Sequence, residues 1–179
     1  METVETTLEQ TNRAAARRLM GAMRARDYVA MADVLAPDVV INSPITDSFR
    51  FRGRDDAITL LKIARDSMHD LEHLELLGAG EVWAQIFRVR VGGRLIEGTD
   101  LLRFDDEGHV RELTLFVRPL AGLAAMAAAL VPAVGRRRGR PTSIVLRMLT
   151  APLAVLTRYG DRLATRLLRG VWWSPGRPA

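Results

Sequence analysis

A chain of 179 residues with 48% hydrophobic and 26% charged residues has the composition of a folded protein, which excludes disorder along its whole length. It contains no cysteine, and this excludes disulfides, thiolate zinc sites and cysteine nucleophiles. Residues 1–135 hold 16 basic and 20 acidic side chains, a net charge of −4. Residues 136–179 hold ten arginines and one acid, a net charge of +9. Any argument for an anionic partner therefore concerns the second segment.

The first part of the chain predicts three helices and two short strands. Capping-box patterns at 6–9 and 7–10 introduce an amphipathic helix that ends near Arg26. Asp27 caps a second helix, and Pro37 ends it because proline disfavours helical geometry at the preceding residue. The remaining elements of this part are a strand at 39–41, a short edge strand at 49–52 and a third helix at 53–68.

Four strand-like segments follow the third helix, at 71–78, 82–91, 94–104 and 109–118. A Gly-Gly pair at 92–93 is a strong hairpin signal between the second and third segments, and an acidic turn at 105–108 joins the third to the fourth. We therefore predict an α+β fold in which a cone-shaped, curved antiparallel sheet wraps around the N-terminal helices.

The pattern changes after the last strand. Residues 120–131 favour a helix, and residues 143–171 favour an apolar helix with regularly spaced arginines, interrupted at Pro152 and Gly160. The segment between these two helices has the composition of a basic linker. The predicted organisation is thus a cone domain over 1–134, a linker over 135–142 and an amphipathic helical tail over 143–179.

One acidic side chain falls on the otherwise apolar face of the predicted strand 94–104. Alternation along the strand places Asp100 on one face with Ile96, Gly98, Leu102 and Phe104. Burial among apolar groups would raise the pKa of Asp100 and suit it to general-acid catalysis. The alternative is a structural carboxyl whose hydrogen bonds are satisfied inside the protein.

The neighbouring strands extend this face into a concave apolar site. Gln85 and Asp100 would be its polar groups, and such a site suits a small hydrophobic molecule. For Trp83 and Phe87 the alternative role is packing in the core. Arg111 is an inward candidate near the rim. The other predicted lining residues of these strands are Leu102, Leu113, Leu115 and Val117.

Histidines give no sign of a metal centre. His69 and His73 would share a face if helical, but no carboxylate joins them at a recognised ligand spacing, and His109 follows a turn where solvent surrounds it. We therefore expect neither a metal nor any other cofactor.

Three stretches carry a family resemblance: RDY at 26–28 leading to LAPDV at 35–39, FRGRDDAI at 51–58, and GTDLLRFDDEG at 98–108. In order and spacing they resemble the SnoaL-like branch of the nuclear-transport-factor-2-like superfamily, over about residues 8–120. The resemblance implies the cone fold. It leaves function open, because the superfamily includes ketosteroid isomerase, polyketide cyclases, limonene epoxide hydrolase and non-catalytic binding domains.

Matched to ketosteroid isomerase, the chain keeps one of three functional residues. The resemblance puts Asp100 at the protonated acid of the oxyanion hole, Ser43 at the carboxylate base and Leu19 at the tyrosine that completes the hole. The mechanism of that enzyme is therefore not expected, although Leu19 and Ser43 remain candidate lining residues. The acidic arrangement of limonene epoxide hydrolase is also absent, since position 98 is glycine.

The tail combines a basic stripe with apolar residues. Arginines at 158, 162, 166 and 169 recur at helical spacing, and Trp172 and Trp173 follow them. This is typical of a helix that lies on an anionic membrane surface, although the helix could instead pack on the domain or on a second subunit of a homodimer. The stretch RGRP at 138–141 resembles an AT-hook, but four residues in a basic linker do not lead us to expect a nucleic-acid partner.

The sequence thus supports two functional hypotheses. The first is a SnoaL-like protein that binds a small hydrophobic metabolite and isomerises, cyclises or hydrolyses it through Asp100. The alternative is a non-catalytic binding or interaction domain that the basic tail attaches to a membrane or partner. The chain shows no signal peptide, and no uncharged stretch reaches the roughly 18 residues that a membrane-spanning helix needs. We therefore expect a cytoplasmic protein, peripherally membrane-associated if the tail binds lipid.

Overall fold

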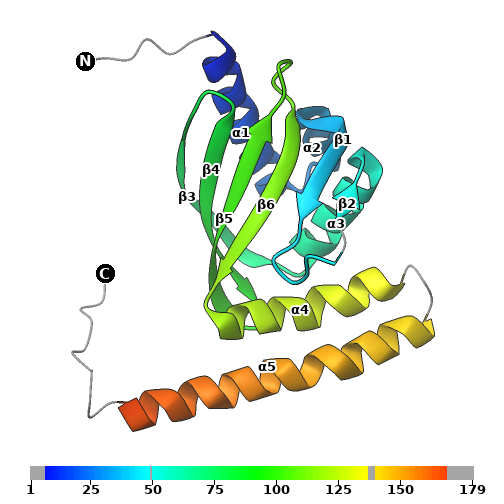
Figure 1. Ribbon diagram of the computed structural model, residues 1–179, viewed down its shortest axis with the longest axis vertical. Coiled ribbons are helices and arrows are strands. Elements are labelled where there is room, and N and C mark those ends of the chain that lie inside the picture. The colour runs from blue at the N-terminus through cyan, green and yellow to red at the C-terminus, as the bar shows by residue number, and fades with distance from the viewer. Residues whose placement is uncertain (1–6, 49, 137–139, 169–179) are drawn as a thin grey trace.

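The computed structural model describes residues 7–48, 50–136 and 140–168, and Figure 1 shows its elements. The helices are α1 (Thr7–Ala25), α2 (Tyr28–Val34), α3 (Arg54–Asp66), α4 (Leu120–Gly135) and α5 (Arg140–Leu168). The strands are β1 (Leu35–Asn42), β2 (Phe51–Arg52), β3 (His69–Ala79), β4 (Val82–Val91), β5 (Arg94–Phe104) and β6 (Val110–Arg118).

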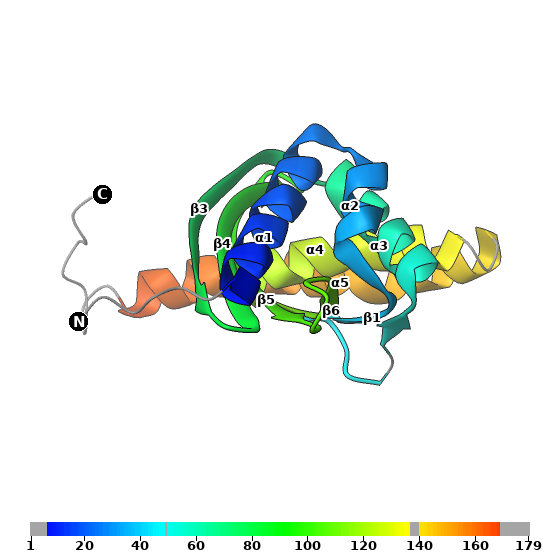
Figure 2. The same cartoon turned by 90° about the horizontal axis from the view of Figure 1, so that it is seen from above.

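All six strands form one curved, unclosed sheet in the order β2-β1-β6-β5-β4-β3. Strands β3 to β6 are the predicted antiparallel meander, while β1 pairs with β6 in parallel. Viewed from above, the sheet curves around α1, α2 and α3 (Figure 2). The predicted α+β cone is therefore confirmed, with the parallel β1–β6 pair as an addition that strand patterns alone do not reveal.

The core lies between the concave face of the sheet and the helices. Leu19 of α1 and Met31 of α2 are at most 1% exposed, because the apolar stripe of each helix faces the sheet. From the sheet, Val89, Leu102 and Phe104 are completely buried. The core thus consists of the strand faces and helix stripes that alternation and periodicity predict.

Two local expectations are wrong in detail. Strand β1 begins at Leu35 and passes through Pro37, where the sequence suggested only a break. The register of β1 against β6 shifts between Leu35 and Val40, and such an irregularity tolerates the missing N–H of proline. Arg111 points outward and pairs with Glu81 at 3.1 Å. The reason is a β-bulge: Phe104 pairs with Val110 and Arg103 with Glu112, so alternation is reset at Arg111.

The C-terminal helices lie at one end of the cone, with α4 between the cone and α5 (Figure 1). Helix α5 runs without interruption through Pro152 and Gly160, where the sequence suggested breaks. Proline has no N–H, so the Met148 carbonyl receives no helical hydrogen bond from position 152. Pro152 and Met148 are both exposed, so water can bond to that carbonyl instead. No helix in the described part of the chain combines the length and apolar character of a membrane span.

The division into domain, linker and tail stays a prediction. Residue 135 belongs to α4 and residues 140–142 to α5, all of which the sequence assigned to the linker. Arg169, Trp172 and Trp173 lie outside the described residues, as do the side chains of Arg158 and Arg162.

Gly98 provides a test of the strand register. It lies opposite Phe87, and a Cβ at position 98 would fall 2.8 Å from Cε1 of that ring. We expect Gly98→Val to lower the free energy of unfolding by about 1–3 kcal/mol through overpacking, and an added Phe87→Leu to recover part of this loss. Urea denaturation measures both. As a control, Gly21→Ala in α1, where a Cβ meets nothing within 4 Å, should be neutral or stabilising. A double variant no more stable than Gly98→Val would contradict the packing.

Candidate functional site

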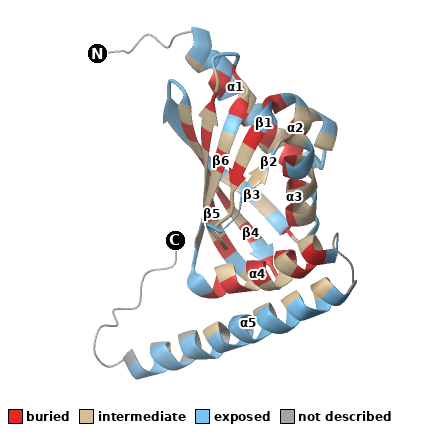
Figure 3. Ribbon diagram, turned by 45° about the vertical axis from the view of Figure 1, so that its right-hand side comes forward, coloured by how far each residue is buried: buried red, intermediate tan, exposed pale blue. Residues whose placement is uncertain are grey.

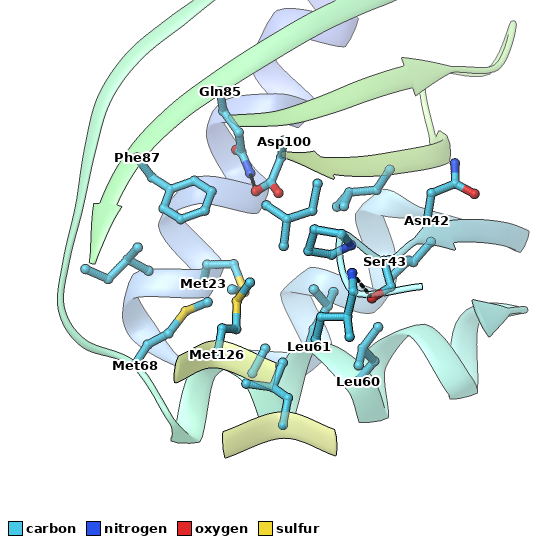
Figure 4. A pocket seen from close by; sticks show the side chains of 18 of the residues that line it. Met23, Asn42, Ser43, Leu60, Leu61, Met68, Gln85, Phe87, Asp100 and Met126 are labelled. Carbon is cyan, nitrogen blue, oxygen red and sulfur yellow. Dashed lines mark hydrogen bonds between the residues drawn. The ribbon is translucent and has the colours of Figure 1, made fainter. Parts of the chain in front are cut away.

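A cavity of about 70 Å³ lies inside the cone. The concave face of the sheet forms one wall, α1 and α3 form another, and α4 closes the end (Figure 4). Its lining is largely apolar, and the loop after β1 adds Ser43 and Pro44 at a partly exposed border. The cavity is therefore lined by residues of eight elements, three helices and five strands, that are far apart in the sequence.

The structure divides the predicted lining residues into two sets. Those that line the cavity are Ser43, Gln85, Phe87, Asp100, Leu113 and Leu115. Those that do not are Leu19, Trp83, Leu102 and Val117. Leu19 and Leu102 are buried in the core, and Trp83 is buried with its Nε1 donating to the Gly80 carbonyl at 3.1 Å. Along α1 it is Met23, one turn after Leu19, that reaches the cavity.

Asp100 on β5 faces Gln85 on β4 across the ladder. Gln85 Nε2 donates a hydrogen bond of 2.6 Å to Asp100 Oδ2 (Figure 4). Burial raises the pKa of Asp100 from 3.8 to about 6, and the hydrogen bond from Gln85 opposes this rise because it favours the charged form. A carboxyl whose pKa lies this close to neutral pH is able to donate or to accept a proton.

His73 on β3 also lines the cavity, and sequence reasoning missed it. Burial lowers its pKa from 6.5 to about 4, with a further contribution from the charge of Arg24, so the imidazole is neutral at pH 7. The sequence suggests His73 only as a possible metal ligand beside His69. Alternation along the predicted strand 71–78 would have placed it with Leu71, which lines the cavity too.

Two polar atoms at the cavity have no hydrogen-bond partner among the described residues. They are His73 Nδ1 and Gln85 Oε1, both on residues that line the cavity. The Asn42 side chain points away from the cavity, and its Nδ2 donates to Glu112 Oε1 at 2.6 Å and to Thr114 Oγ1 at 2.8 Å (Figure 4). Buried polar groups are nearly always paired, so these atoms mark positions where a bound molecule would find partners.

The described residues hold no cluster of three or more histidine, aspartate or glutamate side chains that could bind a metal ion. The chemical groups of this site are thus one carboxyl, one neutral imidazole, the Gln85 amide and the Ser43 hydroxyl, on hydrocarbon walls. Such a set is able to move protons and to hold an oxygen-bearing molecule.

Comparison with known proteins places the fold and the family. The SnoaL-like domain family matches residues 16–113, which is more than half of the chain. A steroid delta-isomerase from Pseudomonas aeruginosa is 26% identical with a TM-score of 0.67, over 75% of this chain and 98% of that one.

Two further solved structures are similar. A candidate ketosteroid isomerase from Kribbella flavida is 26% identical with a TM-score of 0.54, over 62% of this chain and 80% of that one. A candidate SnoaL-like polyketide cyclase from Shewanella denitrificans is 16% identical with a TM-score of 0.51, over 60% of this chain and 90% of that one, a likeness of fold alone. No curated protein matches the chain. With its family match and its cone fold, the chain belongs to the SnoaL-like domain family of nuclear-transport-factor-2-like proteins.

Proposed function

We propose that this chain binds a small, mainly apolar molecule with a carbonyl or epoxide oxygen, and that Asp100 exchanges a proton with that oxygen. The observation that carries the proposal is the position of Asp100: its carboxyl lies at the cavity surface, with one hydrogen bond from Gln85 and a pKa raised to about 6. A carboxyl of this kind is poised between its two protonation states near neutral pH, as a general acid or base must be.

The size and walls of the cavity limit the ligand. A volume of about 70 Å³ is well below the roughly 300 Å³ at which typical ligand pockets begin, so the ligand is small and its entry requires side-chain movement. Met23, Met68 and Met126 line the cavity, and their sulfur atoms are visible in Figure 4. Methionine has a flexible, unbranched side chain, so these walls can adapt to a bound molecule at little energetic penalty.

His73 supplies the second proton-transfer group in this proposal. It lies on β3 and Asp100 on β5, with β4 between them. The register places His73 level with Gly98, two residues along β5 from Asp100, so their backbones are about 12 Å apart. A molecule between them would meet the carboxyl on one side and the neutral imidazole, whose Nδ1 has no partner among the described residues, on the other. Asp100 would protonate the oxygen while His73 accepts a proton from carbon or water, with no cofactor required.

The reaction class follows from these groups and from the relatives. Transfer of protons without a cofactor fits an isomerase, a cyclase or an epoxide hydrolase, and a steroid delta-isomerase is among the similar structures. Ser43, the position resembling the base of ketosteroid isomerase, has a hydroxyl that accepts from the Ile45 N–H at 3.2 Å. In this proposal His73 on β3 accepts the proton, whereas in ketosteroid isomerase the base stands at the position that resembles Ser43.

The first test concerns Asp100. With small cyclic ketones, enones and epoxides as substrates, we expect Asp100→Asn to lower kcat by about 100-fold or more while leaving binding within a few-fold. Glu97→Gln, on the outer face of the same strand, is the matched control. Ala64→Phe, which fills the cavity from α3, should abolish binding seen by NMR shifts. Full turnover by Asp100→Asn would refute the proposed role.

The second test concerns Gln85. Removal of its hydrogen bond withdraws the interaction that favours the charged carboxylate, so Gln85→Leu should raise the pKa of Asp100 above about 6. Carbon-13 NMR titration of the Asp100 carboxyl measures this pKa directly. The limb of the pH–rate profile that reports Asp100 should move to higher pH by the same amount. A lowered or unchanged pKa would contradict this description of the pair.

The third test uses stability. The folded pKa of Asp100 lies above its ordinary value, so its contribution to stability is present at low pH and is lost, by up to about 3 kcal/mol, as pH rises from about 4 to about 6. The folded pKa of His73 lies below its ordinary value, so its contribution is lost as pH falls from 6.5 to about 4. Relative to the unmodified chain, Asp100→Asn should gain stability with rising pH across this window and His73→Gln should lose it. Urea midpoints at pH 4, 5, 6 and 7 measure these stability differences. If the differences for the two variants change with pH in the same direction, one of the two groups is not buried as described.

A further inference from the structure

Helix α4 is buried on two opposite sides. Met126 and Leu130 face the core of the cone and line the cavity. Ala121 and Ala124 are only 5% and 2% exposed but lie outside that core cluster, on the side of α4 that α5 covers. A helix that is apolar around its whole circumference needs such cover on both sides. The body of the protein therefore uses α5 to shield α4.

The side of α5 that meets α4 is its polar side. Ser143 Oγ donates to the Pro132 carbonyl of α4 at 2.9 Å. Thr150 and Thr157 lie one and two heptads later on the same side of the helix, and each is partly buried. Their hydroxyls donate to backbone carbonyls of α5 itself, at 2.9 and 2.8 Å. Helix α5 thus docks through small hydroxylated residues together with Leu146, whose Cδ1 lies beside Gly135 of α4.

The apolar side of α5 faces away from the protein (Figure 3). Leu149 and Leu156 are each 69% exposed, and Leu163 and Leu167 are 57% and 70% exposed. At 100° per residue, the exposed apolar positions from Ile144 to Leu167 cover an arc of about 180°. A helix that belongs only to a soluble domain turns its apolar stripe inward, so this reversed orientation indicates an apolar partner outside the chain.

The charge of the segment identifies that partner. Residues 136–179 carry ten arginines and one acid. At the same spacing of 100° per residue, exposed Arg147 lies about 60° outside one edge of the apolar arc, and exposed Arg166 lies about 40° inside that edge. Two copies of α5 placed face to face would bring two segments of net charge +9 together, whereas an anionic surface neutralises them. An arc of about 180° is also wider than the two-in-seven seam of a coiled coil and suits a helix immersed to half its depth in a lipid interface.

We propose that α5 lies along an anionic membrane surface, with its outward apolar face in the headgroup–acyl boundary and its arginines on lipid phosphates. Its position allows this: α5 runs along one end of the molecule and extends beyond α4, so a flat surface can meet its outer side without contacting the cone (Figures 1 and 2). This proposal is independent of the catalytic one, because it uses no residue of the cavity.

The experiment is flotation of the full chain with vesicles of phosphatidylglycerol or of phosphatidylcholine. We expect binding to the anionic vesicles only, weakened by added salt. Leu156→Glu with Leu163→Glu should reduce the bound fraction at least about tenfold, because two side chains that would be immersed in lipid become charged. Leu77→Glu with Leu95→Glu, 54% and 46% exposed on the outer face of the sheet, is the matched control and should bind as the unmodified chain does.

Other outcomes overturn the proposal. If the unmodified chain fails to float with anionic vesicles at low salt, α5 does not bind lipid. If light scattering in the absence of lipid shows a dimer that Leu156→Glu with Leu163→Glu dissociates, and flotation is absent, the apolar face belongs to a second copy. Circular dichroism checks that each variant is folded. A second test remains if the leucine double variant fails to fold. Arg147→Gln with Arg166→Gln leaves the apolar face intact and should weaken binding to anionic vesicles; unchanged binding would refute the role of the arginines.

Discussion

The pairing of β4 with β5 runs through ten consecutive residue pairs without a bulge, and the interior of the cone depends on it. It sets Gln85 opposite Asp100 and Phe87 opposite Gly98, so a polar pair and an aromatic–glycine pair follow each other along the same face. A slip of one residue would turn every one of these side chains outward. The unbroken ladder therefore shapes the cavity and positions Asp100, the only carboxyl among its described lining residues.

The titratable groups of the cavity share a preference for their neutral forms. Burial raises the pKa of the Asp100 carboxyl and lowers that of the His73 imidazole, because the same hydrocarbon surroundings disfavour either charge. One amide hydrogen bond, from Gln85, partly restores the carboxylate. An interior with these properties favours uncharged molecules over ions. The Asp100 carboxyl changes its charge close to neutral pH, whereas the His73 imidazole stays neutral there.

Much of this arrangement was predictable from alternation and periodicity. The meander, the hairpin at 92–93 and the inward faces of β4 and β5 follow from patterns that are local in the sequence. Arg111 was misplaced because a bulge depends on the partner strand, which the pattern of one strand does not contain. His73 was missed because β3 mixes polar and apolar residues on both faces and gives no clear inward side. The contributions of α3, α4 and the loop after β1 depend on how helices dock on the sheet, and no local pattern encodes this.

Helix α4 belongs to the cavity on one side and to α5 on the other. Met126 and Leu130 share one helix with Ala121 and Ala124, so a shift of the α4 backbone would change the volume of the cavity and the position of α5 together. Thermodynamic linkage then imposes a symmetric relation on the two proposed binding events. By whatever factor attachment of α5 to a surface changes the affinity of the cavity for its ligand, the ligand must change the affinity for that surface by the same factor. A cone with its α4 end tied to its tail in this way could report the occupancy of its interior as a change in where the protein resides.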